Sequence, residues 1–317
     1  MMKAYLFNAD KNTVTEISPE RAVVQAAKGN YCWLDIESPV EDDFLALTKR
    51  FKIQPLAMKQ IRNAAGVPEI ITGTELSYIC WYGPENGVSG QNKRFSCVFG
   101  ESLLITIREG RVPAIDRNLE VLAEEPEILG RGIGILLYNI LDAAVDDYFL
   151  IIDSLSDRID QIEDAMFAHP GADDVRHLFD LKRQMIDLRR VIEPEREVVN
   201  SLLRRELNFL QSNNEVYFQD LYDHLVRIID LIDTLRDVTS GAMQIYQATI
   251  SNNLNAIMKQ LTIIATIMMP LTLISGIFGM NVAFPGKETP AGFWIIMTAI
   301  VAIGAAMLVW VWKRHWI

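Results

Sequence analysis

The chain has 317 residues, 41 of them acidic and 30 basic, for a net charge of −11 at pH 7. This acidic balance excludes a general nucleic-acid-binding role, because contacts with phosphates need clustered lysine and arginine side chains. The sequence contains no nucleophile motif, phosphate-binding loop or dinucleotide fingerprint, so we expect neither an enzyme nor a resident cofactor. The three cysteines lack metal-binding spacing, and we expect buried thiols at Cys32, Cys80 and Cys97.

The N-terminal part, over residues 1–129, mixes strand and helix signals. Short runs rich in β-branched and aromatic residues predict strands at 3–7, 31–36, 77–81, 94–99 and 103–108. Further segments predict helices at 19–28, 41–52 and 55–62. Asn86-Gly87 is typical of a hairpin turn, because both residues tolerate positive φ, so the third and fourth strands are expected to pair. We therefore expect an α/β domain here.

From about residue 130 the strand signals disappear, and residues 130–260 predict long helices. The first is expected over 130–168, the second over 172–210 with an interruption at Pro194, and the third from 214 onward. Apolar residues of the third helix alternate spacings of four and three, which is typical of a coiled-coil seam. The seam consists of Leu221, Leu225, Ile228, Ile232 and Leu235. One helix over 214–280 would be about 100 Å long; a break near Gly241 is the alternative.

Residues 261–317 predict a transmembrane hairpin, which makes the overall class α+β. Two uncharged apolar runs, 261–280 and 293–312, each have about 20 residues, enough helix to cross a bilayer core of about 30 Å. Lys259 precedes the first run, and Lys313 and Arg314 follow the second. The positive-inside rule then places both termini in the cytoplasm. Because the N-terminus lacks the apolar core of a signal peptide, we expect a multi-pass protein of the cytoplasmic membrane.

The first apolar run carries a stripe of small and polar residues at alternating spacings of three and four. The stripe consists of Asn255, Met258, Thr262, Ala265, Met269, Thr272, Gly276 and Gly279. Small residues let membrane helices pack closely, which is one interpretation. The other is a pore lining, in which Met258, Leu261 and Met269 form an apolar gate. Asn281 follows the stripe, where its amide either caps the helix or faces a cation that keeps part of its hydration shell.

An acidic run marks the first long helix. It consists of Asp142, Asp146, Asp147, Asp153, Asp157, Asp160, Glu163 and Asp164. Several of these residues lie three or four apart and so share a helix face. Such a face is either simply solvated or concentrates divalent cations through its field.

Gly279-Met280-Asn281 closes the first of two C-terminal spans, and a basic tail follows the second. In this context the chain resembles the CorA family of divalent-cation transporters, from about residue 130 to the end. The resemblance implies a homopentamer in the lipid bilayer that moves Mg²⁺, and often Co²⁺ or Ni²⁺, with Mg²⁺ also acting as a regulatory ion. It implies selectivity at Gly279, Met280 and Asn281. It places the pore and gate at Asn255, Met258, Leu261, Met269 and Thr272.

Two departures from the family pattern bear on the cation. The outer loop, 282–290, lacks the Met-Pro-Glu-Leu stretch of magnesium channels, which keeps a ZntB-like zinc transporter as the alternative. Asp220 matches the family's regulatory stalk position and Asp223 lies nearby, but the early acidic position is Gln60. Since an amide is a poorer Mg²⁺ ligand than a carboxylate, we expect weaker or differently placed ion sensing. A membrane-anchored coiled-coil sensor without a pore is disfavoured, because it needs neither the stripe nor Asn281.

Overall fold

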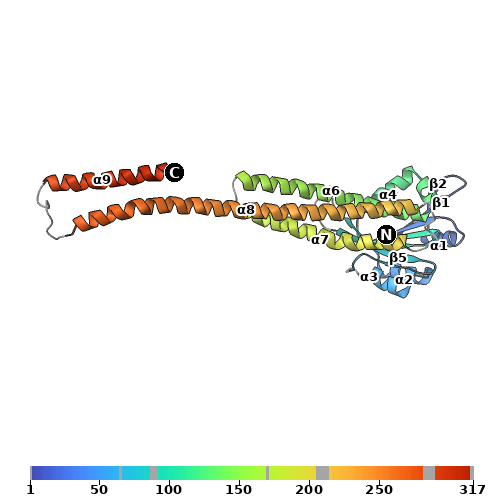
Figure 1. The fold of residues 1–317 in the computed structure, drawn as a ribbon. Coiled ribbons are helices and arrows are strands. Elements are labelled where there is room, and N and C mark those ends of the chain that lie inside the picture. The colour runs from blue at the N-terminus through green and yellow to red at the C-terminus, as the bar shows by residue number, and fades with distance from the viewer. Residues whose placement is uncertain are drawn as a thin grey trace. The chain divides into compact units, whose positions relative to one another are not determined.

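The computed structural model describes residues 2–63, 66–85, 92–168, 171–204, 214–280 and 290–314. The chain divides into two compact units, Met1–Gly241 and Ala242–Ile317. Figure 1 shows the sheet with its covering helices in the first unit and two long helical segments in the second. This mixed architecture confirms the predicted α+β class.

A seven-stranded mixed sheet organises the first unit. Its strands are β1 (Met2–Asn8), β2 (Thr13–Ile17), β3 (Cys32–Glu37), β4 (Glu69–Ile71), β5 (Ser77–Pro84), β6 (Asn92–Phe99) and β7 (Leu103–Arg108), in the order β2-β1-β3-β7-β6-β5-β4. Only the β3–β7 pair is parallel among these strands. All five predicted strands are confirmed, and β5 pairs with β6 as expected. Asn86-Gly87 itself lies outside the described residues.

Helices cover both faces of the sheet. The helices α1 (Pro19–Ala26), α2 (Glu41–Arg50) and α3 (Pro55–Arg62) share a core with one face. The other face packs against α4 (Pro113–Glu124), α5 (Glu127–Gly130), α6 (Ile133–Ala168), α7 (Ala172–Leu203) and the start of α8 (Glu215–Phe278). Neighbouring residues such as Trp33 and Leu34 alternate between the two cores, as expected for a sheet buried on both faces. Neither α4 nor α5 was predicted from the sequence.

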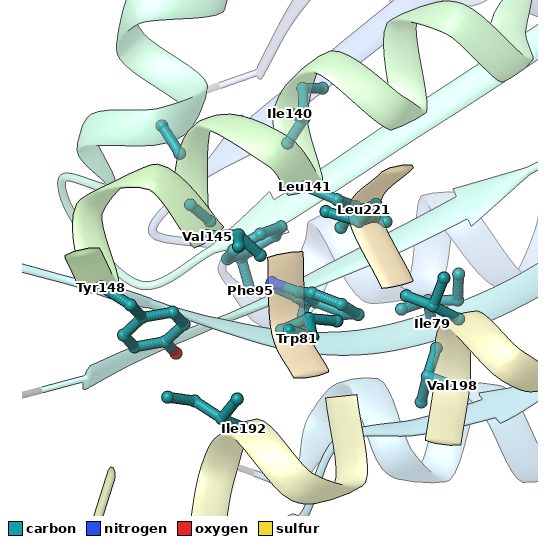
Figure 2. Packing of buried hydrophobic residues seen from close by; sticks show 14 of the residues in the cluster. Ile79, Trp81, Phe95, Ile140, Leu141, Val145, Tyr148, Ile192, Val198 and Leu221 are labelled. Carbon is teal, nitrogen blue, oxygen red and sulfur yellow. The ribbon is translucent and has the colours of Figure 1, made fainter. Parts of the chain in front are cut away.

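One core joins the sheet to the long helices, as Figure 2 shows. Trp81 of β5 and Phe95 of β6 pack in the same cluster as Val145 of α6, Ile192 of α7 and Leu221 of α8. Residues 1–129 and the helices after them therefore share apolar packing, and the division at 129 and 260 stays a prediction. The seam of α8 is confirmed, because its first four members are fully buried. Both α7 at Pro194 and α8 at Gly241 continue without a break.

The second unit contains the C-terminal part of α8 and α9 (Pro290–Lys313). Both helices have an apolar window of membrane-spanning length, with mean hydropathy of 2.1 in α8 and 2.4 in α9. Only 6% of each window is buried, so neither resembles the core helix of a water-soluble protein. Length and composition thus match the predicted membrane hairpin.

Candidate cation sites on the long helices

Two carboxylates and an imidazole meet between α6 and α8 in the first unit. We call Asp142 of α6 with Asp220 and His224 of α8 the α6–α8 cluster; one ligand atom from each lies within 4.8 Å of the others. His224 Nδ1 is 3.5 Å from Asp142 Oδ1, and His224 Nε2 is 3.8 Å from Asp220 Oδ1. The spacing of four places Asp220 and His224 on one helix face. Burial of Leu221 and Leu225 beside them fixes the rotation of α8.

The α6–α8 cluster brings two carboxylates together in an environment that is partly shielded from solvent. Burial is the largest cause of a raised pKa at Asp142, and the negative charge of the neighbouring Asp146 raises this pKa further. His224 lowers it in part. The Tyr138 hydroxyl donates a hydrogen bond to Asp220 Oδ2 at 3.4 Å. Burial and then the carboxylates of Asp142 and Asp220 raise the pKa of Tyr138, so this hydroxyl stays a protonated donor. Among the described residues, no lysine or arginine forms an ion pair with these two carboxylates.

The donor set fits a divalent cation. Asp142 Oδ1 and His224 Nδ1 are buried atoms without a hydrogen-bond partner among the described residues, so each is available as a ligand. The Asp220 side chain is 54% exposed, which lets water complete a coordination shell. Two carboxylates with water suit Mg²⁺, whereas an imidazole nitrogen suits Zn²⁺, Co²⁺ or Ni²⁺ better.

Of the regulatory residues predicted from the sequence, the structure brings only Asp220 into this cluster. Asp223 lies exposed on the same helix, where its carboxylate accepts a hydrogen bond from Gln219 at 3.1 Å, and its metal role stays a prediction. Gln60 lies on α3, outside the cluster, and its backbone carbonyl accepts a hydrogen bond from Arg94 at 2.6 Å. The sequence did not lead us to predict His224 as a member of the site. Its spacing of four residues from Asp220 is the signal that could have identified it, because it places both side chains on one helix face.

The acidic run of α6 separates into different environments. Asp142 belongs to the cluster, whereas Asp147 is buried and its carboxylate lies 3.0 Å from Arg117 of α4. Asp147 therefore helps to hold α4 on α6. The members at Asp146, Asp153, Asp157, Asp160 and Asp164 are exposed, as on a solvated face.

In the membrane hairpin, the predicted pore residues lie on the uncovered face of α8. Ile263 is buried, and Ile267, Leu271 and Ile274 are half-buried at spacings of four, four and three. Leu271 lies against Gly304 of α9, because a Cβ at that glycine would stand 3.4 Å from Leu271 Cδ1. Together these side chains define the face of α8 toward α9.

The opposite face carries the predicted gate. Met258, Leu261 and Met269 are 57%, 58% and 73% exposed. Thr272 lies on the same face, and Asn255 is exposed farther round the helix. The Thr262 hydroxyl donates to the Met258 carbonyl at 2.7 Å, so its hydrogen is used within the helix and its oxygen remains an acceptor.

The selectivity motif begins where α8 ends. The Gly279 amide donates to the Ser275 carbonyl at 2.8 Å, and the Met280 amide donates to Ile277 at 3.3 Å. Asn281 and the outer loop lie outside the described residues. The selectivity role of Gly279, Met280 and Asn281 therefore stays a prediction.

Comparison with known proteins identifies the family. The family model for the CorA-like Mg²⁺ transporter protein matches residues 28–314. The cobalt/magnesium transport protein CorA of Thermotoga maritima is 39% identical over 183 residues, or 57% of this chain. That match covers about half of the relative, 52% of its length. The zinc transport protein ZntB of Cronobacter sakazakii is 25% identical over 305 residues, covering 92% of this chain and 89% of that protein.

A solved structure has the same fold. The complete structure of the CorA magnesium transporter from Methanocaldococcus jannaschii matches with a TM-score of 0.86 and 23% identity, over 100% of this chain and 99% of that one. At this identity the likeness concerns the fold alone. Because the family model covers most of the sequence, the chain belongs to the CorA-like Mg²⁺ transporter protein family.

Proposed function

We propose that this divalent-cation transporter of CorA type mediates influx of Mg²⁺, and of Co²⁺ and Ni²⁺, down the membrane potential. In this proposal it is a homopentamer of the cytoplasmic membrane with both termini inside, because Lys259, Lys313 and Arg314 lie at the predicted inner ends of the two membrane helices. A potential of 100 mV, negative inside, favours inward movement of each divalent cation by about 4.6 kcal/mol, twice the value for a single charge. No catalytic role is proposed.

The observation that carries this proposal is the face of α8 that its own hairpin leaves uncovered. Met258, Leu261 and Met269 are more than half exposed there. Copies arranged around a common axis would cover this face and make it a pore lining. The stretch between Lys259 and Phe278 has no charged side chain, so the pore would pass a cation that keeps much of its hydration shell. Apolar rings would close it by dewetting.

A pair of polar substitutions on α8 tests the gate. Asn in place of Met269 would hydrate the constriction, so we expect Met269→Asn to raise potential-driven Mg²⁺ uptake into proteoliposomes. The matched control, Ile264→Asn, places the same polar group on a 59% exposed position of another face, and we expect uptake close to that of the wild type. Equal effects of the two substitutions would contradict a pore on the Met269 face.

For regulation, we propose that the α6–α8 cluster senses cytoplasmic divalent cations. A bound ion would link α6 to the α8 helix that continues as the pore helix, so occupancy of the site would bias the position of α8. We expect Asp220→Asn and His224→Gln to weaken Co²⁺ binding to the purified full chain by tenfold or more, as measured by calorimetry. Asp230→Asn, an exposed carboxylate elsewhere on α8, is the matched control. Unchanged affinity in both cluster variants would remove this assignment.

Zinc transport is the second candidate. It is supported by the imidazole of His224 in the cluster, a ligand that suits Zn²⁺ better than Mg²⁺, and by the likeness to zinc transport protein ZntB. The two candidates differ in the cation that accumulates in proteoliposomes and in the driving force. Zinc uptake driven by a proton gradient, with little Mg²⁺ uptake, would favour the zinc transporter.

A further inference from the structure

The membrane hairpin contains an apolar groove between α8 and α9, within the second unit. Its volume is about 460 Å³. It is lined by Thr266, Ile267, Ile303, Ala306, Met307 and Trp310, with Val311 at its base. Aliphatic carbon dominates this lining, and the small side chain of Ala306 leaves room between the helices. In a bilayer such a groove accommodates an acyl chain.

The groove leads to a pair of cations. Trp310 and Val311 line it near the end of α9, where Lys313 and Arg314 follow. The Arg314 guanidinium carbon lies 5.8 Å from the centroid of the Trp310 ring. Stacking on an indole orients the guanidinium and leaves the N–H groups in its plane available to an anion. Among the residues that the structure describes, neither Lys313 nor Arg314 forms an ion pair with a carboxylate.

The sequence of the second unit restricts what neutralises these cations. Residues 242–317 contain one acidic side chain, Glu288, which precedes the first residue of α9 in the sequence, whereas Lys313 ends that helix. The membrane helices of a second copy would therefore fill the groove but leave both cations without a carboxylate. A soluble anion would neutralise the cations but leave the groove empty. An anionic phospholipid matches both features.

We propose that the groove between α8 and α9 binds an anionic phospholipid, with an acyl chain along Ala306 and Trp310 and the phosphate on Lys313 and Arg314. This proposal goes beyond the transport function and rests only on insertion of the hairpin into a membrane. Each basic residue near a membrane surface attracts anionic lipid, and two of them imply a preference of roughly 30-fold over zwitterionic lipid.

Quenching of Trp310 fluorescence tests this proposal. The parent protein carries Trp294→Phe, Trp312→Phe and Trp316→Phe, which leaves Trp310 with the fully buried Trp33 and Trp81 as an unquenched background. It is reconstituted into phosphatidylcholine vesicles with increasing amounts of phosphatidylglycerol that carries brominated acyl chains. A second series uses brominated phosphatidylcholine. We expect half-maximal quenching at roughly 30-fold lower mole fraction for the anionic lipid.

Two sets of variants separate the groove from general surface charge. We expect Lys313→Gln with Arg314→Gln to abolish the preference, whereas Arg21→Gln with Lys28→Gln, a charge-matched pair exposed on the first unit, keeps it. Ala306→Phe fills the groove and is expected to abolish selective quenching, whereas Val309→Phe, outside the lining, keeps it.

Equal quenching by the two lipids in the parent protein would overturn the proposal. Both series use the same protein, so the comparison changes only the lipid. A preference that survives Ala306→Phe would overturn it as well. The readout is independent of transport, so its failure leaves the proposed cation flux untouched.

Discussion

A buried carboxyl group on α7 provides the sharpest test of how the first unit is held together. Glu195 is fully buried beside Pro194, and its Oε1 accepts a hydrogen bond from the Tyr82 amide at 3.0 Å. Strand β4 pairs only with Tyr78, Ile79 and Cys80 of β5, so the Tyr82 amide lies beyond its end. Glu195 thus satisfies a backbone donor that the sheet leaves unpaired.

The same carboxyl lies in a neutral, low-dielectric environment. The Tyr148 hydroxyl of α6 donates to the Tyr82 carbonyl at 3.4 Å and lies close to Glu195. Burial raises the pKa of Glu195 well above its ordinary value, and the hydrogen bond from the Tyr82 amide opposes that shift only in part. Burial therefore favours the protonated form of Glu195, whose contact with Tyr82 joins α7 to β5 next to Tyr148 of α6.

Removing this side chain has a cost that follows from the contacts. Glu195→Ala leaves the Tyr82 amide buried and unpaired, which costs about 1–3 kcal/mol. It also removes one buried methylene group, worth about 0.8 kcal/mol. The expected loss is about 3 kcal/mol, or a fall in melting temperature of about 6–12 °C for a unit of this size. Glu195→Gln keeps the acceptor and the shape, so we expect it to stay within about 1 kcal/mol of the wild type at pH 7.

The two substitutions also differ in their pH dependence. A group whose pKa is raised by folding contributes stability that is fully present below its unfolded pKa and is lost as the pH rises through its folded pKa. The wild type should therefore lose stability above the ordinary glutamate range, whereas Glu195→Gln has no proton to lose. The difference in stability should favour Glu195→Gln increasingly with pH, by up to about 1.4 kcal/mol per unit.

Thermal unfolding of the purified full chain from pH 6 to pH 9 measures both effects. Tryptophan fluorescence of proteins that carry Trp294→Phe, Trp310→Phe, Trp312→Phe and Trp316→Phe reports the transition, because Trp33 and Trp81 lie in the core that includes Ile192 and Val198 on either side of Glu195. Parallel changes in the melting temperatures of Glu195→Gln and the wild type across this range would refute the assigned role of the Glu195 proton. Destabilisation of Glu195→Gln equal to that of Glu195→Ala would refute it as well.

Two further predictions concern the first unit. Arg108 and Asp35 form a buried ion pair at 2.9 Å, and each side chain is 4% exposed. Arg108→Met leaves the buried Asp35 carboxylate without its cation, so it should destabilise the protein by about 3–5 kcal/mol. A melting temperature within about 2 °C of the wild type would contradict this. If Gln60 occupies the family's acidic regulatory position, as the resemblance implies, millimolar Mg²⁺ should inhibit flux only weakly. Closure by millimolar Mg²⁺ that Asp220→Ala alone abolishes would contradict this prediction.

The sequence predicts elements best where a periodic pattern runs through a buried surface. Strands β5 and β6 and the seam of α8 have such patterns, and all were found. Strand β2, Thr13–Ile17, lies at the sheet edge and alternates weakly, and β4 has only three residues. Both were missed, because an edge strand needs little apolar surface to pair.

The candidate site was predictable only in part, for a related reason. Periodicity indicates which face of α8 is buried, but not which helix covers it. The family resemblance predicted a regulatory role for Asp220. That Asp220 lies close to Asp142 depends on how α6 and α8 pack in a shared core, which the sequence pattern does not specify. The burial of Glu195 next to Tyr82 and Tyr148 depends likewise on elements distant in the chain.

Cation flux into proteoliposomes that hold the purified full chain tests the central claim most directly. Mg²⁺, Co²⁺, Ni²⁺ and Zn²⁺ are compared side by side, with and without an imposed potential, for the wild type and for Asn281→Ala. We expect Mg²⁺ influx that increases with a negative internal potential and loses its selectivity in Asn281→Ala, while assembly stays intact. Absence of potential-driven influx for every one of these cations, or normal Mg²⁺ uptake in Asn281→Ala, would contradict that claim.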